Sequence, residues 1–191
     1  MHRRKQGPIA LSAALLLAAT VATAQEKKPA EGEHAPAKPA KEHAGFEKLK
    51  QLAGEWEYSK PPADEKGEHK DAPSTVVVYK TIAAGSAVQE TLFPGTPHEM
   101  VTMYHLDGDD LMLTHYCAAG NQPQMKAEKS ADSNKLEFKF AGGTNMDPAK
   151  DTHMHELTLT FTDADHLRAD WTTYQNGKSA GVTTFELKRK K

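Results

Sequence analysis

The residues that could do chemistry are concentrated in residues 100–123, which hold two histidines and the only cysteine of the 191-residue chain. Polar and apolar side chains alternate on both sides of Asp107-Gly108, so this stretch predicts two strands joined by a tight turn. His115 and Cys117 are two residues apart and therefore share one face of the second strand. Imidazole and thiolate on one face could ligate a soft metal or act as base and nucleophile.

The register of this hairpin decides which side chains face inward. A two-residue Asp107-Gly108 loop, or a four-residue loop from Asp107 to Asp110, places even-numbered residues of the first strand beside odd-numbered residues of the second. A three-residue loop would instead set His105 beside His115. We take as interior the face with the aliphatic pair at 111 and 113, which places His105 outside. This face comprises Met100, Thr102, Tyr104, Leu106, Leu111, Leu113, His115 and Cys117.

A second pair, His153 and His155, alternates with Met154 and shares a face with Leu157 and Leu159. His-x-His on a strand aims both imidazoles the same way, an arrangement found in β-barrel metal sites. The structural alternative is a pair of strand-end histidines that reach solvent at the mouth of the fold. For His115 and Cys117 the corresponding alternative is a hydrogen-bonded buried histidine beside a small buried thiol.

The candidate metal ligands are therefore His115, Cys117, His153 and His155. Glu156 and Asp170 lie on the faces opposite to the apolar sets of their strands, so no carboxylate accompanies these histidines for acid–base catalysis. An enzyme that uses Cys117 as its nucleophile is the weakest of the functional hypotheses, and it predicts rapid labelling by thiol reagents.

The elements that must position these residues are short strands with a two-residue period, bounded by turn residues. Asn176-Gly177 is a strong hairpin signal because both residues tolerate positive φ. Consecutive antiparallel strands with short turns form a meander, and closure into a barrel protects its edges. We therefore predict an all-β barrel, with an open two-sheet sandwich as the alternative. The strands are expected around Trp56 and at 74–82, 86–93, 99–106, 110–118, 124–129, 135–141, 153–161, 166–174 and 179–189.

Phe46, Leu49 and Leu52 recur at three-residue spacing and predict one short helix before the first strand. The opening FEKLKQLAGEWEY, with its Gly-x-Trp motif at Gly54-Glu55-Trp56, resembles the lipocalin and fatty-acid-binding-protein (calycin) superfamily. The resemblance implies an antiparallel meander of about ten strands closed into a calycin-like barrel. It also implies that Trp56 plugs the closed end, with Arg189 of the last strand over its ring.

Within that superfamily the chain looks most like exported bacterial lipocalin-like proteins of unassigned function, and more distantly like the nitrobindin haem barrels. The latter carry their haem-binding histidine near the C-terminus. Here the last histidine is His166, so this ligand does not carry over.

Three segments divide the chain. Residues 1–24 carry a basic start, an apolar run from Ile9 to Val21 and a small-residue end at Ala22-Thr23-Ala24, which predicts a secretory signal peptide. Residues 25–44 are rich in Lys, Glu, Ala and Pro and predict a disordered tether. Residues 45–191 form the predicted barrel. We therefore expect a periplasmic or secreted protein.

Composition limits the partners. Cleavage after Ala24 would remove three basic residues and no acidic ones, changing the net charge from −2 to −5. No basic face favours nucleic acid, and no membrane insertion is expected after signal cleavage. A single cysteine cannot form an internal disulfide. We expect a monomer, with a dimer as the alternative.

The leading hypothesis is an exported, non-enzymatic barrel that binds a small, mostly apolar ligand in its lumen. Metal or haem binding is the alternative, and a solid core without a cavity is the structural alternative. No cofactor is expected under the leading hypothesis. The predicted ligand-binding residues are Tyr104, His115, Cys117, Phe138 and Trp171.

Overall fold

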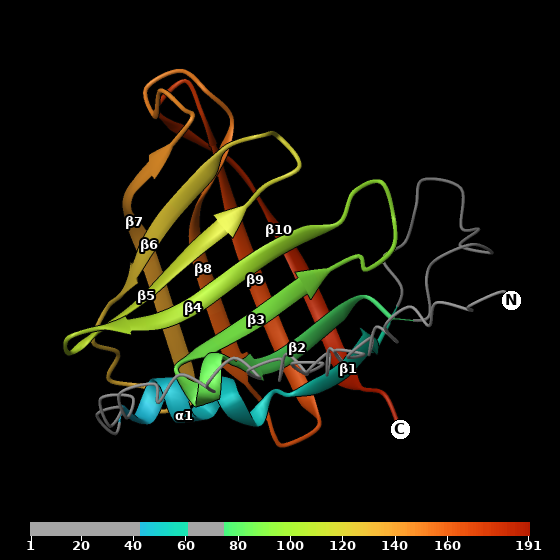
Figure 1. Ribbon diagram of the computed structural model, residues 1–191. Coiled ribbons are helices and arrows are strands. Elements are labelled where there is room, and N and C mark those ends of the chain that lie inside the picture. The colour runs from blue at the N-terminus through green and yellow to red at the C-terminus, as the bar shows by residue number, and fades with distance from the viewer. Residues whose placement is uncertain (1–42, 61–74) are drawn as a thin grey trace, which may run out of the picture. The chain divides into compact units, whose positions relative to one another are not determined.

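The computed structural model describes residues 43–60 and 75–191. These residues form one antiparallel barrel with a short helix at one end (Figure 1). The predicted signal peptide, residues 25–42 of the predicted tether and residues 61–74 lie outside the described residues. Within the described ranges, no helix has both the length and the apolar composition needed to cross a membrane.

Ten strands close the barrel, because β1 pairs with β10 on one side and with β2 on the other, and every other strand pairs with its neighbours in sequence. The predicted all-β meander of about ten strands is confirmed. The elements are α1 (Ala44–Gln51), β1 (Gly54–Tyr58), β2 (Val77–Ile82), a 3₁₀ turn η1 (Ala83–Gly85), β3 (Ala87–Leu92), β4 (Met100–Asp107), β5 (Asp110–Tyr116), β6 (Gln122–Ala127), β7 (Lys135–Thr144), β8 (His153–Phe161), β9 (His166–Gln175) and β10 (Lys178–Arg189).

Tight turns set the strand register. Asn176 and Gly177 have φ values of 51° and 68°, the left-handed backbone that a two-residue hairpin turn needs. In the β4–β5 hairpin Leu106 pairs with Leu111, which is the register of the four-residue alternative. The predicted interior face is confirmed at five positions, while His105 is exposed as expected. The five buried residues are Thr102, Tyr104, Leu111, Leu113 and His115.

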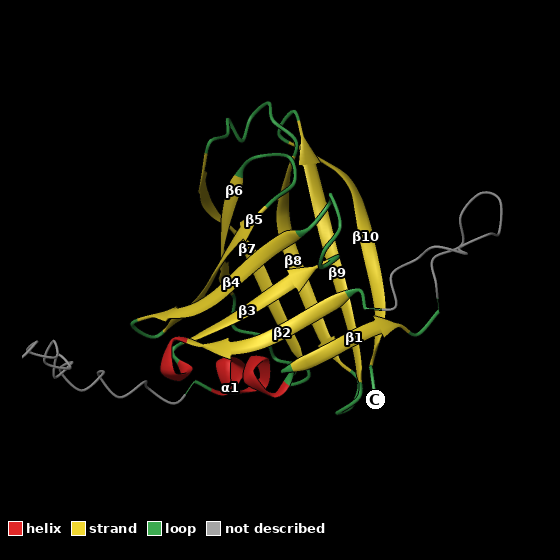
Figure 2. Cartoon of the chain, turned by 45° about the vertical axis from the view of Figure 1, so that its right-hand side comes forward, coloured by secondary structure: helices red, strands yellow, loops and turns green. Residues whose placement is uncertain are grey.

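Helix α1 lies across one end of the barrel (Figure 2). Its apolar residues Phe46 and Leu49 are buried, and His43 caps its start by accepting a hydrogen bond from the Phe46 amide through Nδ1. The helix therefore includes Ala44 and is capped by His43, two residues that the sequence analysis placed in the tether. The side-chain cap explains this early start, because it satisfies an amide that would otherwise lack a partner.

Trp56 seals the same end. Its ring is fully buried, and its indole N–H donates to the Leu52 carbonyl at 2.8 Å. The guanidinium carbon of Arg189 lies 4.5 Å from the centre of the Trp56 ring, which confirms the predicted cation–π contact. Gly54 has a φ of +131°, and a Cβ there would lie 3.2 Å from Nη1 of Arg189. The Gly-x-Trp motif thus contains a glycine with a positive φ and the tryptophan that closes this end of the barrel.

Arg189 also forms hydrogen bonds to two segments that are far apart in the sequence. Its guanidinium donates to the carbonyls of Gln51 at 3.0 Å, the last residue of α1, and of Ala53 at 2.8 Å, just after it. It also donates to the carbonyl of Ala164 in the β8–β9 turn at 3.0 Å. A planar guanidinium can make these contacts while it stacks on an indole, whereas an ammonium cannot.

We therefore expect Arg189→Met to lower the free energy of unfolding by about 2–3 kcal/mol, since it removes hydrogen bonds from a charged donor together with the stacking contact. Urea unfolding measures this loss. Lys188→Met is the matched control, because Lys188 forms an exposed ion pair with Glu57 at 3.1 Å. Such a pair contributes no more than about 1 kcal/mol. Equal losses in the two variants would show that Arg189 does not hold the closed end.

Candidate functional site

The barrel interior is divided into a filled part and a cavity. Large side chains with almost no exposure, among them Trp56, Tyr79, Tyr104, Phe138 and Met125, fill the part next to α1. Toward the opposite end lies a cavity of about 160 Å³, called here the end cavity. A solid core thus describes one part of the barrel only. The end cavity is lined by Leu92, Phe93, Met100, His115, Met154, Trp171, Thr183 and Phe185.

Aromatic side chains form one wall of the end cavity. Phe185 stacks on Tyr58 with ring centres 6.1 Å apart and lies 5.9 Å from the ring of Phe93. Phe93 has a φ of +51°, a left-handed conformation that aromatic residues rarely adopt. Backbone strain of this kind persists only where the surrounding structure enforces it, and it is frequent at ligand sites.

A buried carboxylate organises the polar interior. Glu90 on β3 is 1% exposed and accepts hydrogen bonds from the hydroxyls of Tyr79 at 2.9 Å and Tyr104 at 2.7 Å. Thr102 lies opposite Glu90 on the neighbouring strand β4 and is buried as well. Burial raises the pKa of Glu90, against the opposing effect of the hydroxyls of Tyr104, Tyr79 and Thr102. Burial, with the neighbouring Glu90, also raises the pKa of both tyrosines well above the usual value, so both remain donors.

Thr102 lies between Glu90 and His115 in the sheet, paired with Glu90 on one side and with His115 on the other. The hydroxyl oxygen of Thr102 lies 2.9 Å from Nδ1 of His115, and the imidazole lies 4.8 Å from the Trp171 ring, centre to centre. Burial lowers the pKa of His115 from 6.5 to about 4, so the ring is neutral at pH 7. Within the described part of the chain, Nε2 of His115 and Nε1 of Trp171 are buried and have no hydrogen-bond partner. Buried polar atoms of this kind are rare in native proteins and call for an explanation.

The predicted ligand-binding residues separate into two groups. His115 and Trp171 line the end cavity. Tyr104 and Phe138 belong to the filled core, where their rings lie 5.7 Å apart, and the Tyr104 hydroxyl is already bonded to Glu90. Neither therefore lies where it could orient a ligand in the end cavity.

Cys117 is the third residue that does not line the end cavity. It follows the last residue of β5, and its side chain is partly buried and free. Its amide bonds to the Asn121 carbonyl and its carbonyl to the Gly120 amide, so the chain has already turned there. Cys117 therefore lies just beyond the end of β5 and is not among the residues that line the end cavity.

His153 and His155 bond to each other, with Nε2 of His153 lying 2.9 Å from Nδ1 of His155. A β-bulge at His155 interrupts the alternation of β8, so Met154, not either histidine, lines the end cavity. The predicted shared face with Leu157 depended on unbroken alternation and is wrong for this reason. His153 is 1% exposed, which also corrects the alternative that both histidines reach solvent. The His155 ring stacks on Tyr174 with centres 3.7 Å apart.

Among residues 43–60 and 75–191, no group of three or more His, Cys, Asp or Glu side chains is placed to hold a metal ion. The four predicted ligands are thus not gathered into one such group. Haem fits the end cavity poorly as well. Nε2 of His115 could serve as an axial ligand, but about 160 Å³ is well below the ~300 Å³ at which pockets for drug-sized ligands begin.

Glu90 is the residue that sequence reasoning missed. The carboxylates considered near the histidines, Glu156 and Asp170, instead form ion pairs with Lys139 at 3.0 Å and Arg168 at 2.8 Å. The signal was present on the predicted strand 86–93. There Glu90 occurs between Val88 and Leu92 at the two-residue spacing of an interior face.

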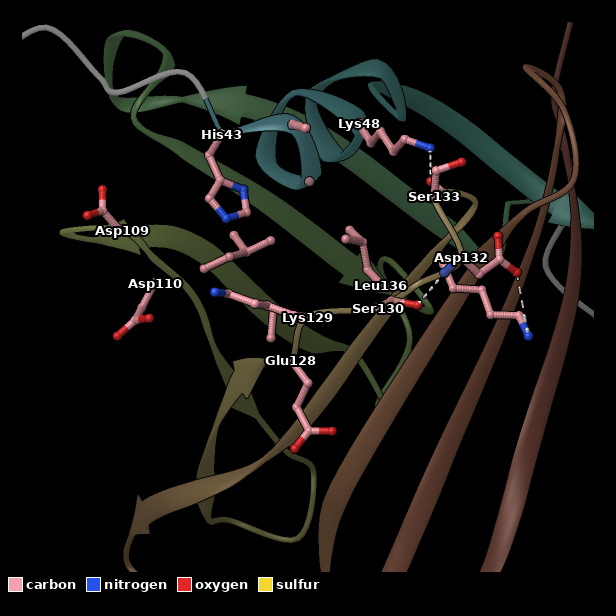
Figure 3. Close-up of a pocket in the computed structure, with 15 residues that line it drawn as sticks. His43, Lys48, Asp109, Asp110, Glu128, Lys129, Ser130, Asp132, Ser133 and Leu136 are labelled. Atoms are coloured by element: carbon pink, nitrogen blue, oxygen red, sulfur yellow. Dashed lines mark hydrogen bonds and ion pairs between the residues drawn. The ribbon is translucent and has the colours of Figure 1, made fainter.

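A second hollow, of about 480 Å³, lies beside α1, between the β4–β5 turn and the β6–β7 loop (Figure 3). Several of its polar groups form hydrogen bonds or ion pairs. Lys48 donates to the Ser133 carbonyl, and Lys135 pairs with Asp132 at 3.8 Å. Asp110 pairs with Lys126 at 2.7 Å. No buried polar atom without a partner belongs to its described lining, so the end cavity is the better candidate site.

The sequence matches no protein-family model and no curated protein. The likeness of this chain to known proteins therefore rests on its architecture. A closed antiparallel meander of ten strands with a short helix before it is a calycin-like fold. Calycin-like barrels of about this strand number are wide enough to hold one small ligand.

Proposed function

We propose that this protein is an exported, lipocalin-like binding protein that holds one small, mostly apolar molecule in the end cavity without transforming it. The observation that carries this proposal is an apolar space of about 160 Å³ whose lining includes His115 and Trp171, each of which has a buried ring nitrogen without a partner among the described residues. A protein that gained only stability from its core would be expected to fill such a space and pair such atoms.

The size of the cavity limits the ligand. A cavity of roughly 150 Å³ lined by apolar side chains holds benzene, so the end cavity has room for about one six-membered ring. The lining favours binding over catalysis, because His115 is the one titratable residue among those that line it and Cys117 lies elsewhere. Export is proposed from the sequence of residues 1–24.

Thr183 offers a direct test of the site. It is exposed, lines the cavity and pairs with Trp171 across the β9–β10 ladder, so it stands at the rim. We expect the purified protein to bind benzene with a Kd of about 0.1–1 mM, in line with the efficiency of very small ligands. Thr183→Trp should raise this Kd at least about tenfold, because the new side chain occupies the opening. Isothermal titration calorimetry measures both values.

Val182→Trp is the matched control. Val182 is the preceding residue of β10, is 59% exposed and does not line the cavity, so its side chain points to the other face. Its substitution should leave the benzene Kd unchanged. The proposal is wrong if the unaltered protein fails to bind benzene, or if Thr183→Trp binds it as tightly as the unaltered protein does.

A further inference from the structure

Two consecutive residues of the chain, Leu92 and Phe93, both line the end cavity. Neighbouring residues of a regular strand point to opposite faces of a sheet. Leu92 ends β3 and is buried on the interior face with Val88 and Glu90, so regular alternation would direct Phe93 outward. Phe93 has a φ of +51°, and this left-handed backbone turns its side chain back toward the cavity.

Hydrogen bonds on both sides fix the backbone of Phe93. Its amide donates to the Val76 carbonyl at 2.8 Å, and its carbonyl accepts from the Thr96 amide at 3.2 Å and the Thr96 hydroxyl at 2.8 Å. The turn that follows is closed by the Gly95 amide, which donates to the Glu99 carboxylate at 2.6 Å. A left-handed conformation is unfavourable for a bulky residue and persists only where such contacts enforce it. The β3–β4 turn therefore holds the Phe93 ring in place.

The Phe93 ring forms the part of the cavity wall that borders solvent at this turn. Phe93 is half-buried, and its ring packs against Phe185, 5.9 Å away between centres at an interplanar angle of 48°. Phe185 is only 6% exposed and stacks in turn on Tyr58. Phe185 thus belongs to the buried core, whereas Phe93 belongs to a turn and separates the end cavity from solvent on that side.

We propose that Phe93 sets the size limit of the end cavity: its ring covers the cavity at the β3–β4 turn and restricts the ligand to about one six-membered ring. The ligand class is that of single-ring hydrocarbons, and this one side chain excludes hydrocarbons of two fused rings. The inference rests on the proposed binding function and adds to it the residue that determines which apolar molecules fit.

Benzene and naphthalene test this limit, because they differ by one fused ring. The unaltered protein should bind naphthalene at least about tenfold more weakly than benzene, since the second ring clashes with Phe93. Phe93→Gly removes a phenyl ring from the wall, and glycine adopts a left-handed backbone without steric cost. We expect this variant to bind naphthalene at least about tenfold more tightly than the unaltered protein does, because the vacated space buries the second ring. Tryptophan fluorescence measures naphthalene binding, since Trp171 lines the cavity.

Phe161→Gly is the matched control. Phe161 ends β8, is half-buried like Phe93 and lies outside the cavity lining, so the same substitution there removes a ring without enlarging the cavity. This variant should keep the preference for benzene. Phe93→Asn is a second test of the same position, because asparagine also tolerates a left-handed backbone, and it should likewise gain naphthalene binding. Since the expected result is a gain of binding, an unfolded variant cannot imitate it.

The outcomes separate the two proposals. If the unaltered protein binds benzene and naphthalene equally, or if neither Phe93 variant gains naphthalene binding, Phe93 does not set the size limit while the binding function stands. An equal gain in Phe161→Gly would mean that losing any ring loosens the barrel, and the role of Phe93 would again be wrong. If the unaltered protein fails to bind benzene, the binding function itself is wrong.

Discussion

Replacing Glu90 with leucine should lower the free energy of unfolding by about 3–5 kcal/mol, the largest loss expected from any single substitution in the polar interior. The change removes the shared acceptor of two buried hydroxyls, those of Tyr79 and Tyr104. Each buried donor left without a partner costs about 1–3 kcal/mol. Rearrangement among the hydroxyls recovers part of the sum. Chemical denaturation monitored by circular dichroism measures the difference.

Glu90→Gln is the matched control, because the amide keeps one carbonyl oxygen as an acceptor at almost the same position. We expect it to cost less than half of what leucine costs. The opposite result, in which leucine is tolerated as well as or better than glutamine, would mean that the network around Glu90 contributes nothing net to stability. Such an outcome is known for some buried charges that are replaced by apolar groups.

The second large effect is a pH dependence that originates at His115. Its pKa is about 4 in the folded protein and 6.5 in the unfolded chain. As the pH falls below 6.5, the unfolded chain binds a proton that the folded protein does not, so acid favours unfolding. The stability that comes from a neutral, buried His115 is present above pH 6.5 and is lost progressively down to about pH 4. The loss amounts to about 3 kcal/mol.

His115→Gln isolates this effect, because glutamine does not titrate. Other groups also change charge in this range, including Glu90, whose raised pKa makes its own contribution of opposite sign. The informative quantity is therefore the change in the free energy of urea unfolding between pH 7 and pH 4, compared between the unaltered protein and His115→Gln. We expect the unaltered protein to lose about 3 kcal/mol more than the variant. Parallel pH profiles would place His115 in contact with water.

The fold was predictable because its determinants are local. Two-residue alternation, the Asn176-Gly177 turn and the three-residue spacing of Phe46 and Leu49 each report on a few neighbouring residues, and the structure agrees with them. The contact of Arg189 with Trp56 joins residues far apart in sequence. It could be predicted only because the Gly-x-Trp motif resembles a superfamily in which the pair occurs.

The site was predictable only in part because it depends on interruptions of strand alternation and on contacts between residues far apart in sequence. The β-bulge at His155 and the turn after Tyr116 move side chains away from positions that regular alternation would give them. Periodicity does not reveal where a strand gains a residue or ends. Glu90 was missed because its position near His115 depends on the pairing of three strands, with Thr102 of β4 between Glu90 of β3 and His115 of β5.

The most direct test of the central claim, that the end cavity binds a small apolar molecule, is a high-resolution crystal structure of the protein grown with benzene. The predicted result is one ring inside the end cavity, in contact with Leu92, Met154 and Phe185. The contrary result is a cavity closed by these side chains, with no space for a ligand.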